Sequence, residues 1–204
     1  MPEAPDLEVI KEFLNKRVRG CRIESATVLK PTVLRSMAND FPGDIPGRTL
    51  EQFHRRGKFL LAELSGDCAL AINPMLTGAL QYCANSERVR KITCVVLGLG
   101  EGRELRYLDD RQMGKVYYLK IEQMSQVPLL QEQKPDVLQG MSFEEFEQGL
   151  KRFRGEIKGV LTRGAFISGI GNACSDEILF AADLSHFRKS GSLSHEELRC
   201  LHDC

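Results

Sequence analysis

The first residues of the chain could supply an amine nucleophile. The chain begins Met1-Pro2-Glu3, and removal of the initiator methionine would expose the secondary amine of Pro2 beside the carboxyl group of Glu3. A secondary amine that adds to an aldehyde carbon forms a positively charged iminium ion directly, without further protonation. A free α-amino group has a reference pKa of about 7.7–8.0, so a good fraction is unprotonated near neutral pH. The alternative is that these residues form a flexible chain start with no chemical role.

A second candidate for chemistry is Lys58, at the end of the sequence His54-Arg55-Arg56-Gly57-Lys58. The glycine predicts a turn, and Lys58 then stands at the head of the next strand. Such a dense cationic tip suits contact with an anionic polymer. The alternative is that Lys58 is an ordinary surface lysine.

Basic residues gather at further places, although the formal net charge is zero and the isoelectric point is near 6.9. Nucleic-acid-binding domains often have an isoelectric point above about 9, so the overall charge does not indicate one. Segregated charge can still create a basic cleft on a neutral protein, and ordinary solvated faces are the alternative. The further clusters are Arg88 to Lys91, the set Arg103, Arg106, Arg111 and Lys115, and Lys151 to Lys158, while acidic residues collect around Glu122 to Glu147.

Hydrophobic spacing indicates the elements that would position these residues. Leu7, Ile10, Phe13 and Leu14 recur at helical intervals and predict a helix over residues 7–18, directly behind Pro2. Short β-like segments separated by glycine turns follow and favour a sandwich or barrel-like sheet. The clearest of these segments are residues 59–64, 69–72, 92–97 and 115–119.

The pattern becomes helical after Pro135. Phe143, Phe146, Leu150 and Phe153 form one apolar stripe, which predicts a helix, and residues 178–182 and 193–202 continue the helical texture. We therefore expect an α+β fold with two domains. A β-rich domain with an N-terminal helix spans residues 1–134, and a small helical domain spans residues 135–204.

Composition limits the class of protein. The chain has 204 residues, of which 42% are hydrophobic, so it can bury a substantial core. No apolar run approaches the roughly 20 residues that span a bilayer, and the N-terminus has no signal-peptide core. The seven cysteines include no Cys-x-x-Cys pair, which favours reduced thiols and an intracellular, cytoplasmic location.

Five short motifs follow one another along the chain: Met1-Pro2-Glu3, Arg55 to Lys58, Asp109 to Gly114, Ile157-Lys158 and Gly169 to Asn172. In this order they resemble the motifs of the formamidopyrimidine-DNA glycosylase and endonuclease VIII family, and the resemblance covers nearly the whole chain. It implies a helix-two-turn-helix second domain and a monomer that binds damaged double-stranded DNA. It also implies a DNA glycosylase with AP-lyase activity, which turns an oxidised base out of the duplex, removes it and nicks the backbone.

The resemblance assigns catalytic roles to three residues. Pro2 corresponds to the Schiff-base nucleophile at C1′ of the damaged nucleotide. Glu3 corresponds to the acid/base group that assists opening of the sugar ring. Lys58 corresponds to the lysine that contacts the phosphate and serves β-elimination.

It assigns DNA contacts to others. Arg111 resembles the arginine that enters the void left by the everted nucleotide and addresses the orphan base, as an arginine fork can; a salt bridge to Asp109 or Asp110 is the alternative. Asn172 follows a glycine turn that lets backbone approach a phosphate, ahead of a helix N-terminus. Lys158 and Arg154 are expected to add phosphate contacts.

The chain also departs from the family pattern. Asn73 stands where relatives have a phosphate-contacting histidine, and Leu76 stands where they have a wedge methionine. Met113 replaces the aromatic residue after the void-filling arginine and stacks less well on a base. Ile92 occupies a further DNA-contacting histidine position. These changes predict a weaker grip on a kinked duplex.

No metal or other cofactor is expected for this chain, because the family's zinc ribbon would begin after residue 204. Cys200 and Cys204 share a helix face near His195, yet spacing within one helix end rarely closes a tetrahedral site. Without the ribbon, DNA affinity should fall and its salt dependence should flatten.

Three functions remain open from the sequence. The first is a DNA glycosylase and AP lyase acting through Pro2, Glu3 and Lys58. The second is a catalytically weak or silent DNA-binding paralogue, suggested by the altered wedge and the missing ribbon. The third is an interaction or structural protein that retains the motifs by ancestry.

Overall fold

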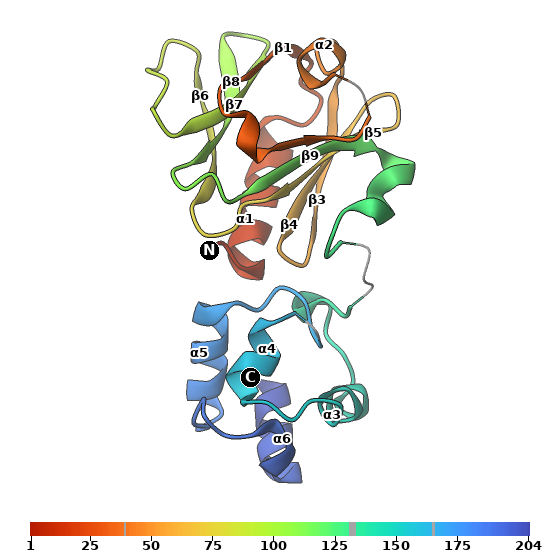
Figure 1. Cartoon of the computed structure of the whole chain (residues 1–204), viewed down its shortest axis with the longest axis vertical. Helices are drawn as coiled ribbons and strands as arrows, with labels where there is room; N and C mark the ends of the chain where they lie inside the picture. The colour runs from red at the N-terminus through yellow and green to blue at the C-terminus, as the bar shows by residue number, and fades with distance from the viewer. Residues whose placement is uncertain (39, 131–133, 165) are drawn as a thin grey trace. The chain divides into compact units, whose positions relative to one another are not determined.

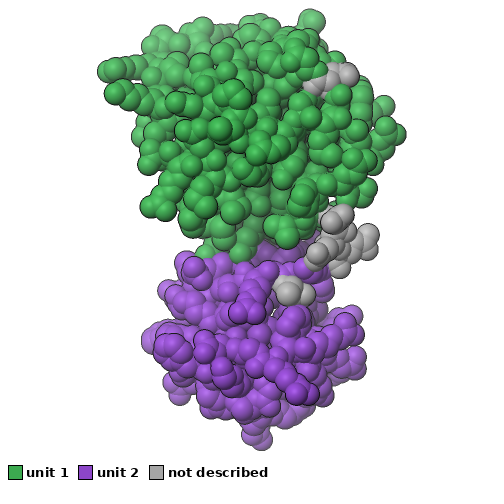
Figure 2. Space-filling model, viewed as in Figure 1, with its two compact units in different colours: residues 1–131 green, residues 132–204 purple. Residues whose placement is uncertain are grey.

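The computed structural model describes residues 1–38, 40–130, 134–164 and 166–204. The chain divides into two compact units, Met1–Gln131 and Glu132–Cys204, which Figure 2 shows in different colours. Among the residues described, no helix is long and apolar enough to cross a membrane. Each unit is considered by itself below.

The first unit begins with helix α1, which runs from Ala4 to Arg17 and starts earlier than the helix predicted for residues 7–18. The start is fixed by residues that precede the apolar stripe. Glu3 is the N-cap, and its backbone N–H donates to the Asp6 carboxylate at 2.9 Å. Pro5 lies in the first turn, where a missing N–H costs nothing. The first turn therefore begins immediately after the Pro2-Glu3 pair.

Within the described residues of the first unit, nine strands form two sheets (Figure 1). One sheet has the order β1-β7-β8-β6 and the other β2-β9-β5-β4-β3, and all neighbours are antiparallel except the parallel pair β2 and β9. The four segments predicted as strands correspond to β4, β5, β7 and β9. Strand β4 has the predicted bounds, β5 and β9 are slightly longer, and β7 begins one residue later and ends two residues later than predicted. The strands are β1 Ile23–Val28, β2 Leu34–Ser36, β3 Leu50–Arg56, β4 Phe59–Leu64, β5 Cys68–Asn73, β6 Gly78–Ala84, β7 Thr93–Leu99, β8 Arg103–Asp109 and β9 Lys115–Lys120.

The core of this unit lies between the two sheets, as expected for a sandwich. Leu97 and Tyr107 from one sheet belong to the same buried cluster as Leu60 and Ile72 from the other. Leu14 of α1 joins that cluster. The helix that carries the N-terminal residues is therefore packed onto the core that supports the strands, which fixes its first turn relative to them.

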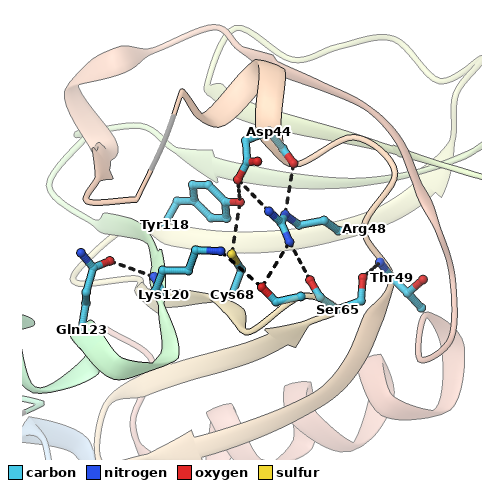
Figure 3. A network of polar contacts seen from close by, with 9 residues as sticks. Asp44, Arg48, Thr49, Ser65, Cys68, Tyr118, Lys120 and Gln123 are labelled. Atoms are coloured by element: carbon cyan, nitrogen blue, oxygen red, sulfur yellow. Dashed lines mark hydrogen bonds and ion pairs between the residues drawn. The ribbon is translucent and has the colours of Figure 1, made fainter.

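A network of polar contacts ties short helix α2, Phe41–Asp44, to the five-stranded sheet (Figure 3). Arg48 donates to the Asp44 carboxylate at 2.9 Å and to the Ser65 carbonyl at 2.7 Å. Tyr118 of β9 also donates to Asp44 and lies 3.6 Å from the Cys68 sulfur. Burial raises the pKa of the Tyr118 hydroxyl, so it stays a hydrogen-bond donor. The contacts satisfy polar groups that would otherwise be costly beneath the sheet.

The second unit is helical (Figure 1). Helices α3 and α6 both begin at serine N-caps with capping boxes. Phe146 packs edge-on to Phe166, with ring centres 5.4 Å apart, inside a core supplied by all four helices. The helices are α3 Phe143–Leu150, α4 Ile157–Thr162, α5 Asn172–Ala181 and α6 His195–Asp203.

Two expected helical residues lie outside the helices of this unit. Phe153 was expected to share a helix with Phe146, but α3 ends at Leu150, and Phe153 packs on the same core from the loop that follows. Leu193 was expected to begin the last helix, but Ser194 caps α6, so Leu193 lies just before it. In both cases the apolar spacing identified core contact and not helix length.

One member of the predicted basic clusters is not on the surface. Arg106 is 0% exposed, and its guanidinium pairs with Glu104 at 2.6 Å and donates to the Glu87 carbonyl at 2.8 Å. A buried guanidinium needs such partners to offset the loss of hydration. The prediction that Arg106 belongs to a basic face is therefore wrong.

Candidate functional site

Pro2 and Glu3 stand at the N-terminal end of α1. Glu3 is 4% exposed, and its carbonyl accepts the first intrahelical hydrogen bond, from Leu7 at 3.0 Å. Pro2 is half-buried. The pair predicted to act together is thus held on adjacent positions of a rigid, well-capped element.

Pro2 also lines a small apolar pocket between the helix and the sheets. The ring shares this pocket with Pro74, Gly78 and Tyr107, which come from the connection between β5 and β6 and from strand β8. An amine released by loss of Met1 would therefore stand beside that connection.

Lys58 lies in the tight turn between β3 and β4, as the sequence predicts, and is half-buried. Gly57 has a positive φ of 56°, a conformation that favours glycine. The turn is tied to α1 through Arg55, whose Nε donates to the Glu8 carboxylate at 2.8 Å and whose Nη1 donates to the Gly57 carbonyl at 3.1 Å. Arg55 therefore fixes the turn of Lys58 to the helix that begins at Glu3.

The two DNA contacts predicted around the loop between β5 and β6, Asn73 and Leu76, differ in their exposure. Asn73 is 8% exposed, and its carboxamide oxygen accepts from the Met75 backbone N–H at 3.2 Å. Leu76 is 48% exposed at the tip of the loop. The Asn73 side chain therefore supports the start of the loop, whereas the apolar side chain of Leu76 is exposed.

Arg111 and Met113 lie on the connection between β8 and β9, and both are exposed. Within the described residues the Arg111 guanidinium forms no ion pair with Asp109 or Asp110, so the salt-bridge alternative finds no support there. Its backbone N–H donates to the Thr77 hydroxyl at 3.2 Å. Arg111 is thus placed next to the loop that carries Leu76, with its charged end available.

Sequence reasoning missed the importance of Asp109, which it treated as an ion-pair partner of Arg111. Asp109 is 1% exposed, and its carboxylate accepts hydrogen bonds from Thr77 and from the Gly114 backbone N–H, the latter at 2.7 Å. The available signal was weak: Asp109 ends strand β8 directly before a predicted contact loop.

Asn172 is the first residue of α5, after N-cap Gly171, and is exposed. Gly169 has a positive φ of 102°, which the glycine turn in the sequence anticipates. The structure thus places Asn172 at the exposed N-terminal end of α5, and its contact with a phosphate stays a prediction.

Lys158 and Arg154 differ in their surroundings. Lys158 of α4 donates to the Asp176 carboxylate at 2.6 Å, so it links α4 to α5. Arg154 is exposed in the loop before α4. Lys158 can meet a phosphate by exchanging a partly exposed ion pair, which is worth little in water.

No group of three or more His, Cys, Asp or Glu side chains in the described ranges could hold a metal ion. Cys200 and Cys204, at the end of α6, are exposed and form no such group with His195.

The geometry can be set beside known proteins. The family model described as "Formamidopyrimidine-DNA glycosylase N-terminal domain" matches residues 1–116, and the "Formamidopyrimidine-DNA glycosylase H2TH domain" model matches residues 134–204. The formamidopyrimidine-DNA glycosylase of Desulforamulus reducens is 34% identical over 205 residues, which cover 99% of this chain and 74% of the relative. The enzyme of Heliobacterium modesticaldum is also 34% identical, over 209 residues, covering 100% of this chain and 76% of the relative.

Solved structures share the fold. A complex of Lactococcus lactis Fpg with DNA containing an oxidised pyrimidine superposes with a TM-score of 0.91 at 23% identity, covering 99% of this chain and 76% of that one. A complex of the same protein with DNA containing an abasic site gives a TM-score of 0.90 at 22% identity, covering 98% and 74%.

Proposed function

The chain belongs to the formamidopyrimidine-DNA glycosylase family, and from that membership we propose that it is a DNA N-glycosylase and AP lyase that acts on oxidised and abasic sites in double-stranded DNA through Pro2. The observation that carries the proposal is that Pro2 and its neighbour Glu3 lie directly before the first turn of α1, and that Pro2 lines a pocket together with Pro74 of the loop that carries Leu76. The partner is DNA, so the protein works in the compartment that holds the DNA.

Pro2 forms and resolves the covalent intermediate. After loss of Met1, the lone pair of the Pro2 nitrogen attacks C1′, and the damaged base leaves with its bonding electrons and a proton. The bond between C1′ and O4′ then opens, so C1′ becomes an iminium carbon bonded to nitrogen. The iminium acidifies the C2′ proton; its removal drives out the 3′ phosphate by breaking the C3′–O bond, and water later releases the chain.

Glu3 moves protons at the sugar. Its carboxyl group, next in sequence to the nucleophile, protonates O4′ as the ring opens and can accept a proton in later steps. Burial at the helix N-terminus restricts the side chain, since Glu3 is 4% exposed. Restricted carboxyl groups lose less entropy when they meet a reacting atom.

Lys58 serves the phosphate and the elimination. Its ammonium group, on the turn that Arg55 ties to α1, is placed to neutralise phosphate charge near the sugar that Pro2 attacks. Charge neutralisation stabilises the departing 3′ phosphate. This role requires a fixed position for Lys58, which the turn held by Arg55 supplies.

Leu76, Arg111 and Met113 grip the duplex where the nucleotide has left. Arg111 addresses the orphan base with its guanidinium fork, and the two apolar side chains enter the stack. In the second unit, Asn172, Lys158 and Arg154 contact phosphates. Because a methionine replaces a ring and a leucine replaces a methionine, we expect abasic sites to be processed better than intact lesions.

Borohydride trapping on a duplex with one abasic site tests the proposal. The protein is prepared untagged, its mass verifies loss of Met1, and a Pro2→Gly variant serves as the control. Hydride addition at C1′ turns the iminium into a stable amine, so the wild type should give a covalent adduct that Pro2→Gly forms at least about tenfold more slowly.

Two other outcomes would contradict the proposal. No adduct from wild-type protein that still binds the duplex would favour a silent DNA-binding paralogue. An adduct of equal yield in Pro2→Gly and in a Lys58→Met variant would assign the amine chemistry to another residue.

A further inference from the structure

Asp109 is a buried carboxylate with donors from three segments of the chain. It is 1% exposed at the end of β8. One oxygen accepts from the Thr77 hydroxyl, and the other accepts from the Gly114 N–H at 2.7 Å and the Tyr107 hydroxyl at 3.4 Å. Several hydrogen bonds are needed to keep a carboxylate stable away from water. Asp109 is therefore a junction and not a surface charge.

The junction joins two loops. Loop A is residues 74–77, which carry Leu76, and loop B is residues 110–113, which carry Arg111 and Met113. Thr77 donates to Asp109 and also accepts from the Arg111 backbone N–H at 3.2 Å. Gly114 closes loop B on the other side of the same carboxylate. One carboxyl group thus holds the base of both loops.

The loops need such support because each contains strained backbone. Met75 in loop A has φ 49°, and Gln112 in loop B has φ 51°. A non-glycine residue in this region is strained and persists where surrounding contacts fix it. Without the contacts to Asp109, both loops would relax toward other conformations.

Close packing links the junction to Pro2. A Cβ atom at Gly114 would lie 1.8 Å from the Tyr107 hydroxyl oxygen, and one at Gly78 would lie 2.4 Å from it. Tyr107 lines the apolar pocket of Pro2 and places its hydroxyl at Asp109. The two glycines therefore allow Tyr107 to connect the nucleophile's surroundings with loops A and B.

We propose that Asp109 is a positioning residue that presets loops A and B, so that Leu76, Arg111 and Met113 enter the duplex together where a nucleotide has been turned out. This inference rests on the proposed function. Preset loops lose little conformational entropy on binding, which lowers the cost of inserting three side chains into a base stack. The effect belongs to duplex substrates, because single-stranded DNA has neither an orphan base nor a stack to enter.

Trapping on two substrates tests the proposal, with an abasic site placed either in a duplex or in the same strand alone. Asp109→Asn keeps the shape but replaces an acceptor oxygen by a donor, and Thr77→Val removes the hydroxyl between Asp109 and Arg111. Both should slow trapping on the duplex about tenfold or more and on the single strand less than about twofold. Thr77→Ser should restore the duplex rate, and the exposed neighbour variant Asp110→Asn should match wild type.

Hydrogen exchange of the free protein supplies a readout that needs no DNA. The amides of Arg111 and Gly114 should exchange about tenfold faster in Asp109→Asn, while the amides of β9 keep their protection.

Equal losses on both substrates, an unchanged duplex rate, or unchanged exchange at Arg111 and Gly114 would each overturn the role of Asp109. Absence of any adduct from the wild-type chain on both substrates would instead refute the proposed function.

Discussion

Replacement of Arg55 by methionine should loosen the turn of Lys58 from α1. The Arg55 side chain is 5% exposed, and it donates to Glu8 of α1 at 2.8 Å and to the Gly57 carbonyl in the turn at 3.1 Å. A hydrogen bond to a charged group contributes about 1.5–3 kcal/mol. Methionine keeps the length of the stem, and Glu8 keeps its hydrogen bond from Lys11. We expect a loss of about 2–4 kcal/mol in the free energy of unfolding.

The same change should slow chemistry beyond its effect on stability. A shift of about 1 Å in a catalytic group can cost on the order of a hundredfold in rate. Without denaturant, and at a temperature at which the variant stays folded, we expect the rate of borohydride trapping to fall about tenfold to a hundredfold. Urea unfolding followed by circular dichroism measures the stability. Arg56→Met, at the exposed neighbouring position, should change it by less than about 0.5 kcal/mol.

Acid should reduce the contribution of Glu8 to the stability of the fold. The pKa of Glu8 is lowered, chiefly by the hydrogen bond from Lys11 and further by Arg55. A carboxyl group whose pKa is lower in the folded state stabilises the fold above its unfolded pKa, about 4.3, and loses that contribution as the pH falls through the folded value. The stability difference between wild type and Glu8→Gln should thus be full at pH 7 and vanish in acid.

For Arg55→Met, a loss below about 0.5 kcal/mol in the free energy of unfolding at pH 7, or an unchanged trapping rate, would refute the reasoning.

Three further expectations concern other parts of the chain. Gly114→Ala should destabilise by about 1–3 kcal/mol through its clash with Tyr107, measured by urea unfolding; wild-type stability would contradict the packing. Hydrogen bonds to Asp203 and to a backbone carbonyl raise the pKa of His202, so its contribution is full below the unfolded pKa of about 6.5 and lost as the pH rises through the folded value. As the pH rises through that value, the thermal midpoint of wild type should fall relative to that of His202→Gln. Parallel curves of thermal midpoint against pH for the two proteins would contradict this contribution. Lys158→Met should reduce the slope of DNA affinity against salt by about one and leave trapping at saturation unchanged; an unchanged slope would remove Lys158 from the phosphate contacts.

Much of the fold followed from local pattern. Short β-like segments separated by glycine turns placed β4 and β9 almost to the residue. The start of α1 was predicted too late, because its first turn is set by the caps Glu3 and Asp6 and not by the apolar stripe. Burial of Arg106 was not predicted, because two of its partners, beside Glu104, are backbone carbonyls, which carry no sequence signal.

The candidate site divides in the same way. The sequence by itself determined which groups can react: an amine that Pro2 can release, a carboxyl group beside it and a cationic turn at Lys58, because these depend on residue type and adjacency. The tertiary structure decided what holds them. Thr77 and Asp109 are 32 residues apart, and Glu8 and Arg55 are 47 residues apart. Such pairs meet when strands and helix pack around a common core, and a hydrogen bond forms only within about 3 Å, which no spacing along the chain encodes.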